Sequence, residues 1–522
     1  MRNNFSKSIG RLSVGVFLLC GPAPIVFTAC TDLTEVPRDA LTPANAFGNE
    51  SEVLAGVASV YAGLRSAGMD DRYNLSEVTT DEIIVPTRGQ DWYDNGRWLE
   101  IYKHTWNANS GSALSDMNGA WNNLFSGVAR ANLMIDVITE AGGPTAPQTL
   151  AELRTLRAWY YYLLMDFFGG VPLVTSTVVE AKPKVSRDSV FKFIEAELKE
   201  AVVVLPATRP ASETGRVTKG AANAILASLY VNAQVYTGTV SASGLTKGAA
   251  RWADAIAAAD AVINSGQYTL EPNWRKNFNP DNDDSKENIF FISNTDAQPG
   301  LGMNFPHRTL HYNQLNTQGG PWNGFATIAE TYNAFDPADK RREIFLVGQQ
   351  YSFDTNQPVK DRGGNNLVFS INIGNETQAA ENEGPRYNKF VPKPGTPDAS
   401  SQPNNFPFFR LAEMYLIKAE AQNELGQTAA AINTVNIIRA RQFATPSPLS
   451  TGLSQAAARD AIFSERLFEL TGEGKRRSDM IRAGTYVNAR RFKTASAPYK
   501  ILFPIPQTQI AANPQLTQNP GY

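Results

Sequence analysis

The stretch LAEMYLIKAEAQNELG at residues 411–426, followed by AAAINTVNIIRAR at 429–441, decides the fold. Apolar residues recur every three or four positions in both parts, and Gly426 separates them, so we expect helices at 409–425 and 429–441. Small alanines allow two helix backbones to approach closely, while Leu and Tyr side chains fill the space between neighbours. The stretch therefore predicts a pair of packed antiparallel helices.

Similar patterns extend through the first half of the chain. They predict further helices at 120–138, 149–168, 188–205, 218–236 and 249–264. Two pairs of helices, at 411–435 and 221–264, resemble tetratricopeptide units, and the pair at 121–168 fits more loosely. Because the spacing is irregular, a uniform solenoid is excluded. We expect a mainly α fold in which helical repeats form a scaffold within one globular body.

Two regions have a different character. Residues 70–115 and 268–408 are rich in Gly, Pro and Asn, and short extended runs at 288–292 and 367–371 predict strands. Five of the eight tryptophans fall in these regions: Trp92, Trp98, Trp106, Trp274 and Trp322. Large aromatic side chains are costly to expose in loops unless they contact something. These regions are therefore the first place to search for a binding site.

Composition excludes several classes of function. The chain has 522 residues with 48 basic and 50 acidic side chains, a balance that argues against a nucleic-acid partner. Its two cysteines, Cys20 and Cys30, both lie in the first thirty residues. A structural disulfide, a cysteine zinc site and a cysteine nucleophile in the globular body are thereby excluded. With only three histidines, we expect no metal and no cofactor.

The first thirty residues look like an export signal. Arg2, Lys7 and Arg11 precede a short apolar stretch, which is too short for a lasting membrane span of ~20 residues. FTAC at 27–30 resembles a bacterial lipobox, in which lipid is attached to Cys30 and the chain is cut just before it. We expect a signal peptide at 1–29 and a lipidated tether at 30–47. The alternative is a soluble secreted protein cleaved near Ala29.

Several segments, in order, resemble landmarks of the SusD/RagB family of outer-membrane nutrient-binding lipoproteins. They are LRAWYY (156–161) with FGGVPLV (168–174), GRVTKGAA (215–222), FRLAE (409–413) with AEA (419–421), Asn436, Arg439 and Arg441, ERLFEL (465–470), GKRRSDM (474–480), PIP (504–506) and QNPGY (518–522). Each fragment alone is a weak signal, but their order is specific. Ser478 departs from the pattern, because an aromatic residue is common before that aspartate.

The resemblance implies an architecture. It places one SusD-like domain at 48–522, with its repeat scaffold at about 117–265 and 409–441 and a C-terminal block at about 460–522. The ligand face would come from the irregular regions, at about 70–115 and 268–408.

The resemblance also implies a role. Family members lie on the cell surface, held at the outer membrane by lipid, and close as a lid over a SusC-like TonB-dependent transporter. Their cargo is typically an oligosaccharide, and in some members a peptide. They do no chemistry on that cargo.

Two clusters have the side chains that sugar binding needs, namely flat rings for pyranose faces and planar amides or charges for hydroxyl groups. The candidates are Trp92, Tyr93, Asn95, Arg97 and Trp98 in DWYDNGRW (91–98), and Tyr312, Asn313, Trp322 and Asn323 in HYNQ (311–314) and PWN (321–323). The alternative is that each ring fixes its own loop to the scaffold, and that Asn95 and Arg97 hold the turn at Gly96.

Other functions leave weaker signals. A surface glycoside hydrolase would need a pair of carboxylates, and nothing distinguishes one pair among Asp81, Glu82, Asp91 and Asp94. Neither G-x-S-x-G nor H-E-x-x-H occurs, and HRTLH (307–311) lacks the glutamate of a zinc motif. A peptide-binding member of the family and a purely structural repeat protein stay as alternatives.

Two further charged motifs favour structural roles. DNDD (281–284) lacks the glycine of a calcium loop and is expected to be an acidic turn before the strand at 288–292. The basic clusters RR (476–477) and KRR (340–342) are expected to be salt-bridge partners.

Overall fold

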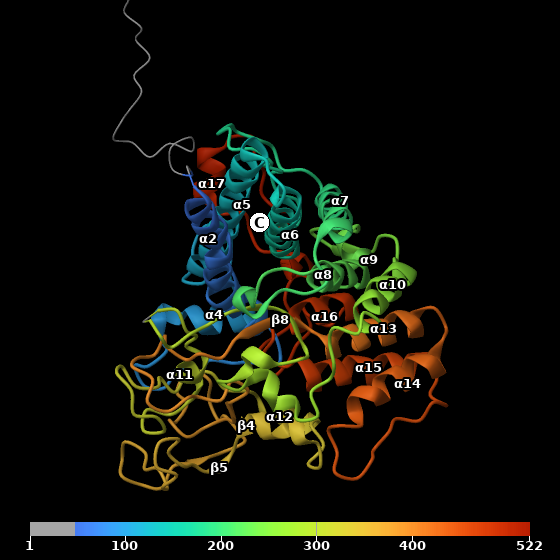
Figure 1. The fold of residues 1–522 in the computed structure, drawn as a ribbon. Coiled ribbons are helices and arrows are strands. Elements are labelled where there is room, and N and C mark those ends of the chain that lie inside the picture. Colours follow the sequence, from blue (N-terminus) through green and yellow to red (C-terminus); the bar gives the residue numbers. More distant parts are fainter. Residues whose placement is uncertain (1–46, 48, 299) are drawn as a thin grey trace, which may run out of the picture. The chain divides into compact units, whose positions relative to one another are not determined.

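Helices are the predominant secondary structure in the computed structural model, which describes residue 47 and residues 49–298 and 300–522 (Figure 1). The predicted mainly α class is confirmed, with a few short strands. The predicted signal peptide with Cys20 lies outside the described residues, as does the predicted tether with Cys30, except for Phe47. Among the described helices, none is long and apolar enough to cross a membrane.

A succession of helices forms the scaffold. Its members are α5 (Leu114–Ala141), α6 (Ala146–Phe168), α7 (Arg187–Val204), α8 (Lys219–Val231), α10 (Trp252–Ile263), α13 (Leu411–Glu424) and α14 (Thr428–Arg439). Each packs on the one before it, and Figure 1 shows the row continuing from α10 to α13. The long irregular insertion therefore leaves the row after α10, and the chain returns to continue it. The predicted helix pairs are confirmed.

One predicted helix is divided. The helix expected at 218–236 is instead α8, followed by the short α9 (Ala233–Tyr236). At the break, the side chain of Asn232 donates to the carbonyl of Ser228 at 2.9 Å and accepts from Arg482 at 2.8 Å. Asparagine side chains compete with helical backbone bonds in this way.

The region predicted as loop at 70–115 contains two short helices, α3 (Asp71–Glu77) and α4 (Arg97–Lys103). A longer helix, α2 (Glu50–Met69), precedes them and begins with a capping box between Asn49 and Glu52. Helices of seven residues span only two turns and show too little periodicity to be recognised in sequence. The remaining helices are α11 (Phe305–Thr309), α12 (Ala329–Ala334), α15 (Gln455–Leu470), α16 (Arg476–Ala483) and α17 (Gln507–Ala512).

Short antiparallel strand pairs lie mainly in the insertion. They are β3 (Asn288–Ile292) with β8 (Phe406–Arg410), β4 (Phe345–Leu346) with β7 (Arg386–Tyr387), and β5 (Gly348–Gln349) with β6 (Val368–Phe369); β1 (Thr239–Ser241) with β2 (Gly244–Thr246) precedes them. The strand expected at 288–292 is confirmed, whereas that at 367–371 is shorter. Phe409, which was expected in a helix, belongs to β8.

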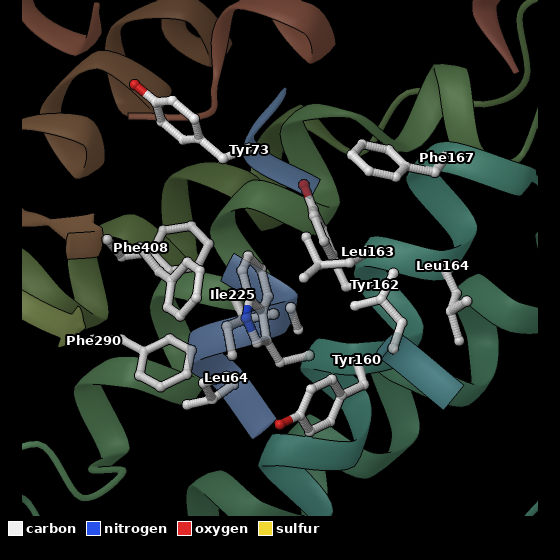
Figure 2. Close-up of a cluster of buried hydrophobic side chains, with 14 of the residues drawn as sticks. Leu64, Tyr73, Tyr160, Tyr162, Leu163, Leu164, Phe167, Ile225, Phe290 and Phe408 are labelled. Atoms are coloured by element: carbon white, nitrogen blue, oxygen red, sulfur yellow. The ribbon is translucent and has the colours of Figure 1, made fainter. Parts of the chain in front are cut away.

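Aromatic packing attaches the insertion to the scaffold (Figure 2). Phe290 of β3 and Phe408 of β8 point into the core beside residues of α2, α6 and α8. The ring of Trp159 in α6 lies 5.1 Å from that of Phe408 and 5.9 Å from that of Phe290, both edge-on. Edge-to-face geometry of this kind stabilises aromatic pairs beyond the area that they bury.

Buried ion pairs form a second attachment. Arg410, at the end of β8, contacts Glu287 and Glu469 at 2.7 Å and Glu473 at 2.8 Å. Arg441 contacts Glu287 and Glu469 as well. The side chains of Arg410, Glu287 and Glu469 are completely buried, so each charge depends on its partners. The FRLAE (409–413) and ERLFEL (465–470) segments thus join the insertion, the scaffold and the C-terminal block.

Three residues of the basic clusters, and the acidic turn, have the structural roles that were predicted, whereas Arg342 lies over the ring of Tyr332 at 4.2 Å from its centre. Arg476 pairs with Asp81 at 2.8 Å, Arg477 with Asp166 at 2.7 Å, and Arg341 with Asp339 at 2.7 Å. The acidic segment at 281–284 is a turn, which Lys276 closes through Asp281 and Asp284.

Candidate functional site

The two irregular regions meet at a cluster of aromatic rings. Trp92 comes from the first region and Trp322 from the second, and their ring centroids lie 6.4 Å apart. The indole N–H of Trp92 donates to the carbonyl of Trp322 at 2.6 Å. Trp98 and Phe325 pack edge-on against Trp92 at 5.2 and 5.6 Å. These four side chains form the aromatic cluster.

Unusual backbone conformations hold the cluster. Trp92, Asn95 and Asn323 have left-handed φ angles of 62°, 55° and 53°. For a bulky residue such as Trp92 this costs about 1–3 kcal/mol, and such strain is concentrated at functional sites. Gly324 allows the ring of Trp92 to lie against the backbone, because a Cβ there would be 2.2 Å from Cε2 of Trp92.

The cluster is open to solvent at two of its rings. Trp92 and Trp322 are half-buried, whereas Trp98 is 5% exposed and its indole N–H donates to Asp94 at 2.6 Å. Trp106 and Trp274 are buried as well. Most of the tryptophans in the irregular regions therefore stabilise their loops, as the alternative interpretation expected, and Trp92 and Trp322 remain available to a ligand.

Tyr312 adds a third ring, which is linked to Asp91, the residue before Trp92. Its hydroxyl donates to Asp91, and the guanidinium of Arg362 lies 4.3 Å from the centre of its ring. Arg362 also contacts Asp91 at 3.2 Å and Glu381 at 2.8 Å. We call Trp92, Trp322, Tyr312 and Arg362 the candidate binding face. It offers flat rings together with a fixed, partly exposed cation, and such groups can bind a sugar ring and its hydroxyl groups.

Burial and hydrogen bonds determine the protonation states of Tyr312, Arg362 and Glu381 at this face. Burial, and then the hydrogen bond to Asp91, raises the pKa of Tyr312 to about 12, so the phenol is a neutral donor. The hydrogen bond to Glu381 raises the pKa of Arg362, which keeps its full charge. Burial raises the pKa of Glu381, but its bonds to Arg362 outweigh burial and leave that pKa below its usual value.

Two neutral histidines lie beneath the face. The rings of His307 and His311 are 6.0 Å from that of Trp322 and 5.0 Å from that of Tyr312. Burial lowers the pKa of each to about 4. His307 and His311 do not lie on one face of a helix, because α11 ends at Thr309, before His311. Within the described part of the chain, no group of three His, Cys, Asp or Glu side chains could hold a metal ion.

Other predicted site residues have different surroundings. Tyr93 and Asn95 are exposed, and so is Asn313, whose amide donates to the carbonyl of Lys360 at 2.9 Å. Arg97 instead binds the buried Asp116 through Nε at 2.6 Å, which fixes the start of α4.

Asn323 is also buried, so it cannot meet a ligand directly. Its side chain accepts from Arg386 at 2.9 Å and donates to the carbonyl of Glu381 at 2.8 Å. Trp98, through Trp92, and Asn323, through Glu381, therefore position residues of the candidate binding face.

Arg362, Glu381 and Gly324 were missed by sequence reasoning. Arg362 and Glu381 lie in a segment with no aromatic motif, and only the folded chain brings them to Tyr312. Gly324 directly follows PWN (321–323), but its close approach to Trp92 depends on a residue more than two hundred positions away.

The carboxylates considered for hydrolysis all have structural partners. Asp81 pairs with Arg476, and Asp94 accepts from Trp98. Glu82 is 1% exposed and accepts from the backbone N–H of Gly472 at 2.8 Å. Asp91 is held by Arg362 and Tyr312 as described above.

Two known proteins are similar in sequence to this chain over most of its length. A SusD-like protein of Formosa agariphila is 24% identical over 94% of this chain and 96% of its own. The starch-binding protein SusD of Bacteroides thetaiotaomicron is 25% identical over 86% of this chain and 85% of its own.

Solved structures share the fold. Surface glycan-binding protein A from Bacteroides fluxus superposes with a TM-score of 0.71 over 91% of this chain and 100% of its own, at 23% identity. The corresponding protein from Bacteroides thetaiotaomicron, in complex with laminarihexaose, gives 0.69 over 90% of this chain and 99% of its own, at 20% identity.

Family profiles cover nearly all of the described residues. Residues 44–231 match a profile described as starch-binding associating with outer membrane. Residues 260–497 and 483–522 match the profile of the SusD family, which accounts for just over half of the chain. The chain belongs to the SusD family.

Proposed function

We propose that this protein is a non-catalytic, cell-surface glycan-binding lipoprotein. The observation that carries the proposal is the candidate binding face, where two regions far apart in sequence bring flat rings together and leave them open to solvent. Trp92 is held there at the cost of an unfavourable backbone conformation. The names of two relatives, the starch-binding protein and the glycan-binding protein solved with laminarihexaose, support a glycan rather than a peptide.

The proposal includes no reaction on the glycan. Asp91 and Glu381, the carboxylates bound to the candidate binding face, both contact the guanidinium of Arg362. A general acid for glycoside cleavage needs a raised pKa, whereas that of Glu381 is lowered. The face is therefore suited to hold a sugar and not to cleave it.

Affinity electrophoresis of the purified chain in gels containing starch or laminarin tests the proposal, with calorimetry on maltohexaose and laminarihexaose to measure affinity. We expect retardation by at least one polysaccharide and no new reducing ends after incubation. Binding to a peptide library without any response to glycans would contradict the proposed ligand class. New reducing ends would contradict the absence of catalysis.

We also propose that the chain is anchored to the outer membrane through Cys30 and delivers its glycan to a SusC-like TonB-dependent transporter. The lipobox-like FTAC (27–30) and the family resemblance motivate this. Acyl chains hold a protein at a membrane surface without a spanning helix, and they raise its local concentration near a partner.

Metabolic labelling with palmitate tests the anchor. We expect label in the native chain and none in Cys30→Ala, while Cys20→Ala serves as the matched control within the same leader. Label in Cys30→Ala would contradict the assigned site. Delivery is tested by growth on the bound glycan, which should fail when the gene for this protein is deleted and recover when the native gene is restored.

A further inference from the structure

A hollow lies away from the candidate binding face. It has a volume of about 400 Å³ and lies between α2, the turn at 214–216, the end of β3 and Leu301. Pockets that hold small molecules usually measure about 300–1,000 Å³ and are mostly apolar. The candidate binding face is built from other segments, so this hollow is not part of it.

The outer face of α2 makes the hollow. Leu54, Ala58, Tyr61, Ala62 and Arg65 follow one another at helical spacing along it. The alanines leave the space open, since larger side chains at these positions would fill it. Opposite them stand Phe291 and Ile292 of β3.

The hollow exposes apolar surface that the fold does not cover. Leu54 is 56% exposed and Leu301 is 37% exposed, one on each side. Contiguous exposed apolar surface around a concave site is typical of ligand-binding grooves. A ligand with an apolar body would remove this surface from water.

Arg65 gives the hollow its charge. Its guanidinium donates to the carbonyls of Leu301 at 2.9 Å and Ser293 at 3.1 Å, and to the side-chain oxygen of Asn294. These acceptors are all neutral, and within the described part of the chain Arg65 forms no ion pair. Burial lowers the pKa of Arg65, and no acidic group offsets that effect. A partly buried cation without a counter-charge is stabilised by an anion that binds beside it.

Arg216 also lines the hollow, but unlike Arg65 it forms ion pairs. It pairs with Glu152 at 2.6 Å and with Glu213 at 2.7 Å. Of the described residues that line the hollow, the charged ones are these two arginines. The lining is therefore complementary to an anion, and Arg65 is the cation that lacks one.

We propose that this hollow binds a small apolar carboxylate, with the apolar body against α2 and β3 and the carboxylate at Arg65. The body can be an alkyl chain or an aromatic ring, and both offer the same chemistry to these walls. The proposal does not depend on glycan binding at the candidate binding face.

Calorimetry on the purified full chain tests this, with octanoate and trans-cinnamate as probes and 1-octanol and cinnamyl alcohol as uncharged counterparts. We expect an acid to bind about 10-fold or more tightly than its alcohol, because charge-assisted hydrogen bonds to Arg65 are lost in the alcohol. Binding of octanoate alone indicates an alkyl ligand, and binding of cinnamate alone an aromatic one. If neither acid binds at millimolar concentration, or if acid and alcohol bind equally, the proposal is wrong.

Variants locate the site. Arg65→Gln should weaken the acid about 10-fold or more and leave the alcohol unchanged, and Ala62→Phe should abolish binding of both. Ala55→Phe is the matched control, because Ala55 is exposed on α2 but does not line the hollow. Equal losses in Ala55→Phe and Ala62→Phe, or no effect of Arg65→Gln, would overturn the assignment. The comparison of acid with alcohol on the native chain stands even if a variant fails to fold.

Discussion

Replacing Gly324 with alanine should displace Trp92, although Gly324 is buried and is not itself part of the candidate binding face. The new Cβ would lie 2.2 Å from Cε2 of Trp92 and 2.4 Å from Cζ2. Carbon atoms pack at about 3.5–4.0 Å, so the ring has to retreat by roughly 1.3 Å or more. The φ angle of Gly324 is outside the left-handed region, and alanine therefore brings no backbone strain of its own.

The displacement of Trp92 should lower both the stability of the fold and the affinity for glycan, and each can be measured. Overpacking of this kind destabilises a fold by about 1–3 kcal/mol, and the 2.6 Å bond from Trp92 to the carbonyl of Trp322 contributes about 1 kcal/mol of that. Loss of one properly placed ring should weaken glycan binding about 10- to 100-fold, which corresponds to about 1.4–2.8 kcal/mol. Calorimetry with the best-bound glycan measures the second effect, and urea unfolding measures the first.

Two further variants test whether Gly324 acts by positioning Trp92. Gly452→Ala is the matched control, because the nearest atom to its Cβ would be the hydroxyl of Ser450 at 3.6 Å. The double variant Gly324→Ala/Trp92→Ala should bind no worse than Trp92→Ala alone, since both changes act through one ring. Native affinity in Gly324→Ala, or additive losses in the double variant, would show that Gly324 does not act by positioning Trp92.

Three other changes have distinct expected outcomes. Trp322→Ala should weaken glycan binding by about 10-fold or more with little change in melting temperature, because the ring is only half-buried and its indole bond to Gly319 is long at 3.3 Å. A large fall in melting temperature would instead assign the ring to the core. Glu469→Gln should destabilise the fold by about 3–5 kcal/mol in urea, since Arg410 and Arg441 would lose a buried counter-charge; a loss below about 1 kcal/mol would contradict this. The pKa of His307 is lowered to about 4, so the folded state resists its protonation and stability is lost as pH falls from about 6.5 to 4. His307→Gln should reduce that loss by up to about 3 kcal/mol, and an unchanged pH profile would refute it.

The helical scaffold could be predicted because a helix is indicated by the spacing of apolar residues within a short stretch of sequence. The period of apolar residues in 120–138, 149–168 and 188–205 corresponds closely to α5, α6 and α7, and Gly142 and Gly169 end their helices where expected. The strand at 288–292 was found for the same reason. Short helices such as α4 were missed, because two turns carry no clear period.

The candidate binding face was only partly predictable. Trp92, Tyr312 and Trp322 belong to short motifs of aromatic and polar residues, and this composition was visible in the sequence. It could not distinguish them from Trp98 or Trp106, which have the same chemistry but are buried. Exposure depends on which segments cover a ring, and those segments come from distant parts of the chain.

Sequence by itself therefore determined the class of fold and the approximate extents of the scaffold helices, although it missed α2, and it indicated two regions in which a binding site is expected. These follow from periodicity and composition, which act over a few residues. Tertiary structure alone decided that Trp92 and Trp322 meet, that Arg362 covers Tyr312, and that Arg65 faces an apolar hollow without a carboxylate. Each of these depends on contacts between segments separated by tens to hundreds of residues, and no local pattern encodes such distances.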